Sequence, residues 1–176
     1  ENQAKKIQIY ENFENKELRA LTGGSYARIN DSQALDWIQP RAEAGGFELP
    51  LAYNRNKKPG DHRQMVPAGA YASDRDMFLF MVNNSRKVEV GGESLGRGFF
   101  LWNSEVGARS FGMETFPFRY VRGNHIVWDA RDVRKFRTIH VGQGASLRAE
   151  NIVESALSGY LEPVTKAEVE MITKAQ

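Results

Sequence analysis

Apolar positions near the start of the chain follow a helical spacing. Three of them recur three and four residues apart, on one side of a predicted amphipathic helix: Ala34, Leu35 and Ile38. Asn30-Asp31-Ser32 precedes them and offers residues that favour a helix N-cap. Pro40 argues against a longer uninterrupted helix, because proline lacks a backbone N–H. Gly45-Gly46 closes the segment, so we expect one short helix before it.

The middle of the chain has the apolar runs and alternation of β-strands. Residues 77–82 (Met-Phe-Leu-Phe-Met-Val) predict a central strand, because the run is too short and too aromatic for a helix. Residues 54–64 contain no large apolar side chain and predict an exposed loop. Further strands are predicted at 26–30, 47–53 (an edge strand, because of Pro50), 87–90, 97–103, 108–118, 124–128 and 134–141.

Helical spacing returns at the end of the chain. Residues 145–160 predict one helix, and residues 165–173 predict a second one after Pro163. The order of elements predicts an α+β fold, with a mostly antiparallel sheet in the middle and an early helix and C-terminal helices packed on it. The length of 176 residues suits a single domain spanning 1–176.

Composition narrows the chemistry. The chain contains no cysteine, which excludes disulfides, thiolate zinc sites, iron–sulfur clusters and cysteine nucleophiles, and favours a reducing compartment. No apolar run approaches the roughly 20 residues that cross a bilayer. We therefore expect a cytoplasmic protein with no membrane partner.

Positive charge is concentrated in one stretch that the net charge of +2 conceals. Residues 119–148 hold seven basic and two acidic residues, a net +5, whereas residues 149–176 hold two basic and five acidic residues, a net −3. Arginines grip phosphates and aromatic rings stack on unpaired bases, so the mixture predicts a single-strand binding site. The predicted site consists of Arg119, Tyr120, Arg122, Trp128, Arg131, Arg134, Lys135 and Arg137. The alternative is a sheet with aromatic core residues and solvated arginines.

Catalytic and cofactor motifs are weak. Gly91 to Gly98 lacks the Gly-Lys-Ser/Thr of a phosphate-binding loop and predicts a hairpin turn or bulge with glycines at positive φ. Gly142-Gln143-Gly144 only partly matches a strand–Gly-x-Gly–helix unit. The histidine spacing fits no metal motif, although a nuclease-like cluster could form from His125, Asp129, Asp132 and His140. We expect no cofactor, no bound metal and no catalysis.

Two segments, Phe99 to Gly107 (Phe-Phe-Leu-Trp-Asn-Ser-Glu-Val-Gly) and Phe118 to Val127, resemble the DUF932 family. The resemblance runs from about residue 26 to residue 160, leaving 161–176 as a C-terminal helical extension. It implies a phage- or plasmid-like protein of a mobile element, acting in a bacterial cytoplasm, and supplies no catalytic residues. Relatives often carry a cysteine where this chain has Arg122, which excludes a redox or metal role for that position.

Three functions follow, in order of preference. The first is non-catalytic binding of nucleic acid, single-stranded DNA above all, in phage replication, recombination or host takeover. The second is a homo-oligomeric assembly or host-protein interaction module, in which the acidic C-terminal segment meets the basic stretch of a neighbour. The third is a metal-dependent nuclease that uses Asp129, Asp132 and His140.

Overall fold

The computed structural model describes residues 7–12, 14–53, 65–90, 93–121, 125–127 and 134–161. Its elements are β1 (Ile7–Glu11), β2 (Leu18–Gly23), α1 (Asp31–Gly45), β3 (Leu51–Tyr53), β4 (Met65–Pro67), β5 (Ala70–Ala72), β6 (Met77–Val90), β7 (Glu93–Asn103), β8 (Phe111–Val121), β9 (His125–Val127), β10 (Arg134–Thr138) and α2 (Ala145–Leu161). No helix in these ranges is both long and apolar enough to span a membrane.

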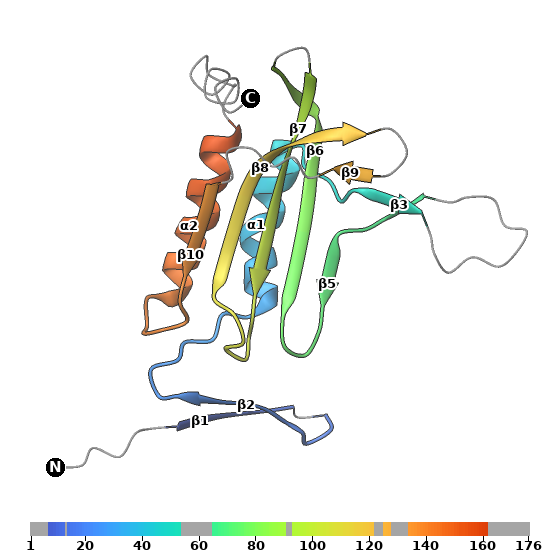
Figure 1. Ribbon diagram of the computed structural model, residues 1–176. Helices are drawn as coiled ribbons and strands as arrows, with labels where there is room; N and C mark the ends of the chain where they lie inside the picture. The colour runs from blue at the N-terminus through green and yellow to red at the C-terminus, as the bar shows by residue number, and fades with distance from the viewer. Residues whose placement is uncertain are drawn as a thin grey trace, which may run out of the picture.

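A six-stranded antiparallel sheet forms the centre of the fold (Figure 1). Its order is β10-β8-β7-β6-β5, and β9 pairs with the end of β8. Consecutive strands β5, β6, β7 and β8 pair with their neighbours in sequence, as expected for an antiparallel meander. Two small hairpins, β1-β2 and β3-β4, lie beside it. The α+β class with a central antiparallel sheet is therefore confirmed.

Both helices pack on the same face of this sheet. Ile38 and Ala42 of α1 and Val153 and Leu157 of α2 share one buried cluster with alternate residues of the strands: Met77, Leu79, Phe99, Leu101, Phe111 and Met113. Figure 1 shows the two helices side by side behind the strands. We call the opposite face of the sheet, which neither helix covers, the open face.

Helix α1 runs uninterrupted through Pro40, which the sequence argued against, and ends at Gly45, where the Gly45-Gly46 signal predicted its end. Pro40 lies on the exposed side, where water can bond the Asp36 carbonyl that lacks an N–H partner. Burial of the apolar stripe outweighs the loss of that one bond. The helix ends at Gly46, whose φ of 75° suits glycine and whose N–H donates to the Glu43 carbonyl at 3.0 Å.

The end of α2 is held to the sheet by a tyrosine and an arginine. The Tyr160 hydroxyl accepts a hydrogen bond from the Gly98 N–H at 3.2 Å and donates to the Phe116 carbonyl. The buried Arg97 guanidinium donates to the Tyr160 carbonyl and lies 5.2 Å from the Tyr160 ring centre. A cation near a helix C-terminus is favoured there. The predicted second helix, 165–173, lies outside the described residues.

Several strand predictions need correction. Residues 87–90 continue the long strand β6 and do not form a separate strand. In 26–30, only Tyr26 makes a bridge, with Val141. In 47–53, the strand shortens to Leu51–Tyr53, with one further bridge between Glu48 and Val82. The predicted loop 54–64 lies outside the described residues.

Gly96 and Gly98 do not form the predicted turn, because both lie inside β7 and neither has a positive φ. Each is the cross-strand partner of an aromatic residue of β8, Phe118 for Gly96 and Phe116 for Gly98. A Cβ on Gly96 would lie 2.7 Å from the Phe118 ring, so the ring occupies the place of the missing side chain. The glycines therefore make room for two buried phenylalanines on the open face.

Candidate nucleic-acid interface

One row of residues crosses the open face from edge to edge. Arg137 of β10 pairs with Gly112 of β8, which pairs with Trp102 of β7. Trp102 pairs with Phe78 of β6, and Phe78 pairs with Tyr71 of β5. Five strands about 4.8 Å apart give the row a span of roughly 19 Å. The row contains three aromatic residues and ends in an arginine.

The rings of this row are connected through Phe100, which precedes Trp102 by two residues on the same face of β7. Ring centres are 6.2 Å apart for Tyr71 and Phe78, and 5.6 Å apart for Phe78 and Phe100, which are stacked. Phe100 continues to Trp102 at 5.9 Å. Tyr71 is 57% exposed, and the other three side chains are half-buried. We call Tyr71, Phe78, Phe100 and Trp102 the aromatic platform.

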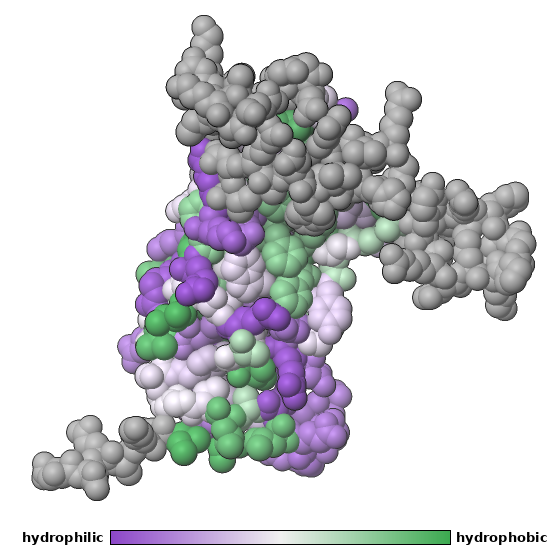
Figure 2. All heavy atoms as spheres, viewed as in Figure 1, coloured by the Kyte–Doolittle hydropathy of each residue, from purple (hydrophilic) through white to green (hydrophobic). Residues whose placement is uncertain are grey.

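The aromatic platform lies beside a part of the open face that is buried. Phe80, Val82, Phe116 and Phe118 form a second buried cluster towards one end of the sheet, and Phe100 packs against its edge. Figure 2 looks onto this face and shows apolar side chains gathered over β6 and β7, with hydrophilic side chains around them. The open face thus carries an apolar surface that is partly core and partly accessible.

Cations border the aromatic platform on two sides. The Arg109 guanidinium carbon lies 5.1 Å from the Phe78 ring centre, and its Nε donates to Asp76 Oδ2 at 3.2 Å. Lys135 Nζ lies 2.8 Å from Glu114 Oε1 across the β10–β8 pair. Arg137 is exposed and makes no ion pair within the described part of the chain. Arg137 is therefore the cation best placed to meet a phosphate beside the rings.

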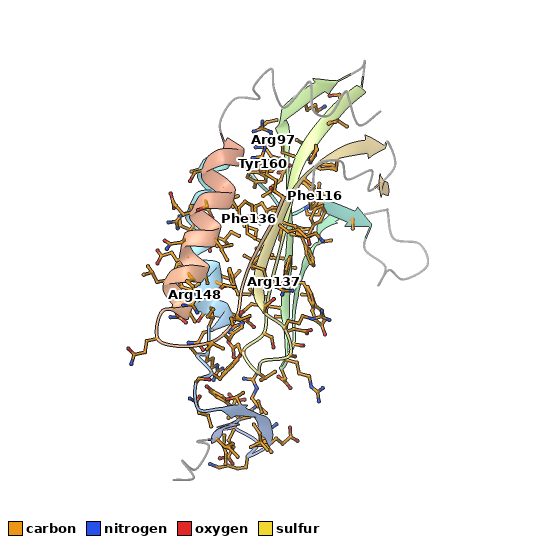
Figure 3. All side chains as sticks on the ribbon, turned by 60° about the vertical axis from the view of Figure 1, so that its left-hand side comes forward. Arg97, Phe116, Phe136, Arg137, Arg148 and Tyr160 are labelled. Carbon is orange, nitrogen blue, oxygen red and sulfur yellow. The ribbon has the colours of Figure 1, made fainter. Side chains whose placement is uncertain are left out.

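The predicted cluster of cations is divided between two faces of the sheet. Arg134 and Phe136 share one face, and Figure 3 shows Phe136 lying towards α2. Lys135 and Arg137 share the open face, because successive side chains of a strand alternate. Of the other predicted residues, Arg119 and Tyr120 lie in β8 with undescribed side chains. Arg122, Trp128 and Arg131 lie outside the described residues.

His140 is buried beneath the β1–β2 hairpin. Its ring stacks on Tyr26 with centres 5.3 Å apart, and it is 4% exposed. Burial lowers the pKa of His140, and both ring nitrogens lack a hydrogen-bond partner in the described residues. Asp129 and Asp132 lie outside those residues, so the nuclease cluster stays a prediction. The described ranges hold no group of three or more His, Asp or Glu residues that could bind a metal.

The Gly142–Gly144 turn does lie between a strand and a helix, but an arginine fills it. Arg148 reaches back from α2 and donates to the Val141 carbonyl at 2.6 Å and to Thr138 Oγ1 at 3.1 Å. A Cβ on Gly144 would lie 3.1 Å from the Arg148 guanidinium. The guanidinium therefore binds the turn's own carbonyl oxygens, and the turn does not carry the candidate site.

Asn103 and Ser104, two of the positions that carry the family resemblance, hold the fold together. Asn103 Nδ2 donates to the Ile29 carbonyl at 2.9 Å and to Asp31 Oδ1 at 2.7 Å. Ser104 Oγ donates to the Arg75 carbonyl at 2.6 Å. These two residues join the end of β7 to the start of α1 and to the loop before β6.

Glu105 also connects the segment after β7 to the start of α1. Burial alone would raise the pKa of the Glu105 carboxyl, but the Asp31 N–H at 2.8 Å and the Arg28 guanidinium lower it below its ordinary value. Arg19 lies 3.6 Å away on the hairpin. The carboxylate thus stabilises the N-terminus of α1 and attaches β2 to the body.

Sequence reasoning missed the aromatic platform and Arg109. A signal was present, because residues 77–82 and 99–102 are apolar at both odd and even positions, which is typical of strands buried on two faces. Because both helices cover one face, three aromatics of the other face, Phe78, Phe100 and Trp102, are only half-buried. Comparisons of the chain with protein-family models, curated proteins and solved structures found no match. The resemblance to DUF932 stays a prediction.

Proposed function

We propose that the protein binds single-stranded nucleic acid on the open face of its central sheet, without catalysis. Bases stack on the aromatic platform, and Arg137 and Lys135 contact the phosphate backbone. The observation that carries this proposal is the row of rings that crosses the sheet and ends at Arg137.

The chemistry of the row favours unpaired bases over a duplex. Stacking on a protein ring requires a free base face, which a duplex hides between neighbouring base pairs. Alanine substitution of such a stacking ring costs about 1–3 kcal/mol per base. A platform of four rings therefore supports useful affinity with little sequence preference, since every base has a π-face.

The charge beside the rings supports the same ligand. Lys135 and Arg137 both belong to the basic stretch 119–148, and both lie on the open face. Glu114 neutralises Lys135 in the free protein, so a phosphate would have to compete with this exposed pair, which is a weak one. The resemblance to phage- and plasmid-like proteins supplies a setting, because replication and recombination of mobile elements expose single-stranded DNA.

Fluorescence anisotropy with a labelled oligothymidine tests the proposal. We expect binding that weakens with salt, with a log–log slope of roughly −0.7 per phosphate contact. Tyr71→Ala should weaken binding about 5- to 150-fold, the equivalent of 1–3 kcal/mol, whereas Tyr71→Phe should retain it. Tyr71 is the most exposed ring, so its removal leaves the core intact.

Two substitutions in β10 remove the same charge from opposite faces of the sheet and form a matched pair. Arg137→Gln removes a cation from the open face and should reduce the salt slope by about 0.7. Arg134→Gln removes the same charge from an exposed position on the opposite face and should bind like the wild type. No binding at low salt, or equal losses in both arginine variants, would refute the proposed site.

A further inference from the structure

The β1–β2 hairpin turns its apolar side outwards. Ile7, Ile9, Leu18 and Leu21 are 68%, 68%, 59% and 62% exposed. Figure 2 shows these apolar side chains gathered at the lower end of the molecule, where Figure 1 places β1 and β2. We call these four residues the hairpin patch. A sheet that packs on a body ordinarily directs its apolar side chains inwards, so this orientation is reversed.

A β-bulge keeps the hairpin patch on one face. Tyr10 pairs with Ala20 and the next residue, Glu11, pairs with Leu18, so Arg19 is an extra residue in β2. In a regular strand without a bulge, Leu18 and Leu21 are three residues apart and would lie on opposite faces. The bulge restores Leu18 to the outer face, beside the directly paired Ile9 and Leu21.

The inner face of the hairpin is attached to the body through polar and aromatic groups. The Tyr10 ring meets the Tyr26 ring edge-on at 6.0 Å. Arg19 lies 3.6 Å from Glu105, and Gln8 Nε2 donates to the Gly24 carbonyl at 3.1 Å. These contacts hold the hairpin in place, and none of them involves a residue of the hairpin patch. The apolar outer face is therefore available for another molecule.

We propose that the hairpin patch is a homodimer interface, in which the same face of a second copy packs against it around a two-fold axis. The patch is self-complementary, because Ile9 and Leu21 lie at its centre and Ile7 and Leu18 flank them. A two-fold axis through the centre sets aliphatic against aliphatic side chains. With the axis in the plane of the contact and perpendicular to the strands, the Glu11 end of one hairpin lies over the Ile7 end of the other, which keeps the two carboxylates apart. Such an isologous contact closes on itself and stops at a dimer.

The area available predicts a weak, concentration-dependent dimer. An aliphatic side chain carries about 60–120 Å² of apolar surface, so eight side chains at these exposures bury roughly 500 Å². If slightly more than half of the interface is apolar, the total is about 900 Å², which is less than the roughly 1,200 Å² of stable specific complexes and is typical of weak ones. The patch itself contains no cation, and exposed Glu11 lies beside it, which disfavours nucleic acid or an anionic membrane as the occupant.

Sedimentation velocity of the full chain, from low micromolar to several hundred micromolar, tests the proposal. We expect the wild type to shift from monomer to dimer, and the Ile9→Glu/Leu21→Glu variant to stay monomeric at every concentration. Leu51→Glu is the matched control, because Leu51 is 56% exposed on β3, away from the hairpin, and should dimerise like the wild type. Circular dichroism checks that all three proteins are folded.

Because the chain has no cysteine, an introduced thiol reports the contact directly. Ile9→Cys should form a disulfide-linked dimer on mild oxidation, and Leu51→Cys should not. The proposal is overturned if the wild type remains monomeric throughout, if the double glutamate variant dimerises unchanged, or if both thiol variants crosslink equally. Binding of the monomer to neutral lipid vesicles through the same patch would also overturn it.

Discussion

Gly112 lies in β8 directly beneath the indole of Trp102, its cross-strand partner. An added Cβ would lie 2.2, 2.5 and 2.9 Å from three atoms of the indole, far inside ordinary contact distance. The φ of Gly112 is not positive, so alanine suits the backbone and the conflict is with the ring alone. Gly112→Ala must therefore displace Trp102 from the aromatic platform.

The expected cost follows from two opposing effects. Alanine in a strand is about 0.5–1 kcal/mol more favourable than glycine where space allows. Overpacking of this kind costs typically 1–3 kcal/mol, because side chain and backbone must both shift. We therefore expect Gly112→Ala to lower the free energy of unfolding by about 1 kcal/mol, and by at most about 2.5 kcal/mol. It should also weaken oligothymidine binding, because Trp102 no longer lies beside Phe100.

Urea denaturation in a double-mutant cycle measures this coupling. In a Trp102→Val background the ring is absent, so Gly112→Ala should be neutral or slightly stabilising. Gly23→Ala is the control substitution, since nothing lies within 4 Å of a Cβ at Gly23 in β2. An equal penalty for Gly112→Ala in both backgrounds, or none in the wild type, would show that the indole does not fill the place of the missing side chain.

Three further substitutions test other parts of the fold. Asn103→Ala should cost about 1–3 kcal/mol in urea denaturation, because it removes buried hydrogen bonds to Asp31 and to the backbone before α1. Burial lowers the pKa of His140 below its ordinary 6.5, so the unfolded state binds more protons, and stability declines as pH falls below 6.5. In His140→Gln this part of the pH dependence should disappear, whereas an unchanged profile would assign it to other groups. Pro40→Ala should raise the thermal midpoint, because proline inside a helix is up to about 3 kcal/mol less favourable than alanine and Pro40 is exposed.

Local periodicity predicted most of the fold. The strands at 77–82 and 97–103 and the helix at 145–160 were correctly expected. The run 77–82 is too short and too aromatic for a helix, and the apolar residues of 145–160 have helical spacing. Pro40 was misjudged, since the stabilisation of α1 comes from packing against α2 and the sheet, which local sequence does not contain. The β6 boundary was wrong for a similar reason: after a register shift across the polar residues 84–87, pairing with β7 resumes at Val88 and carries the strand to Val90.

The candidate site was only partly predictable. Lys135 and Arg137 were predicted from charge together with Arg134, but the alternation of β10 places Arg134 with Phe136 on the opposite face. The aromatic platform depends on cross-strand register, because Trp102, Phe78 and Tyr71 come from three strands. Register arises from pairing across the whole sheet and leaves no mark in the spacing of one strand.

Photocrosslinking to iodouracil-substituted single-stranded DNA, followed by mass spectrometry of the joined peptides, tests the central claim most directly. The open-face site predicts adducts on Tyr71, Phe78, Phe100 or Trp102, suppressed by unlabelled oligothymidine and by high salt. Adducts confined to α1, α2 or the β1–β2 hairpin, or no competable adduct at all, would contradict it.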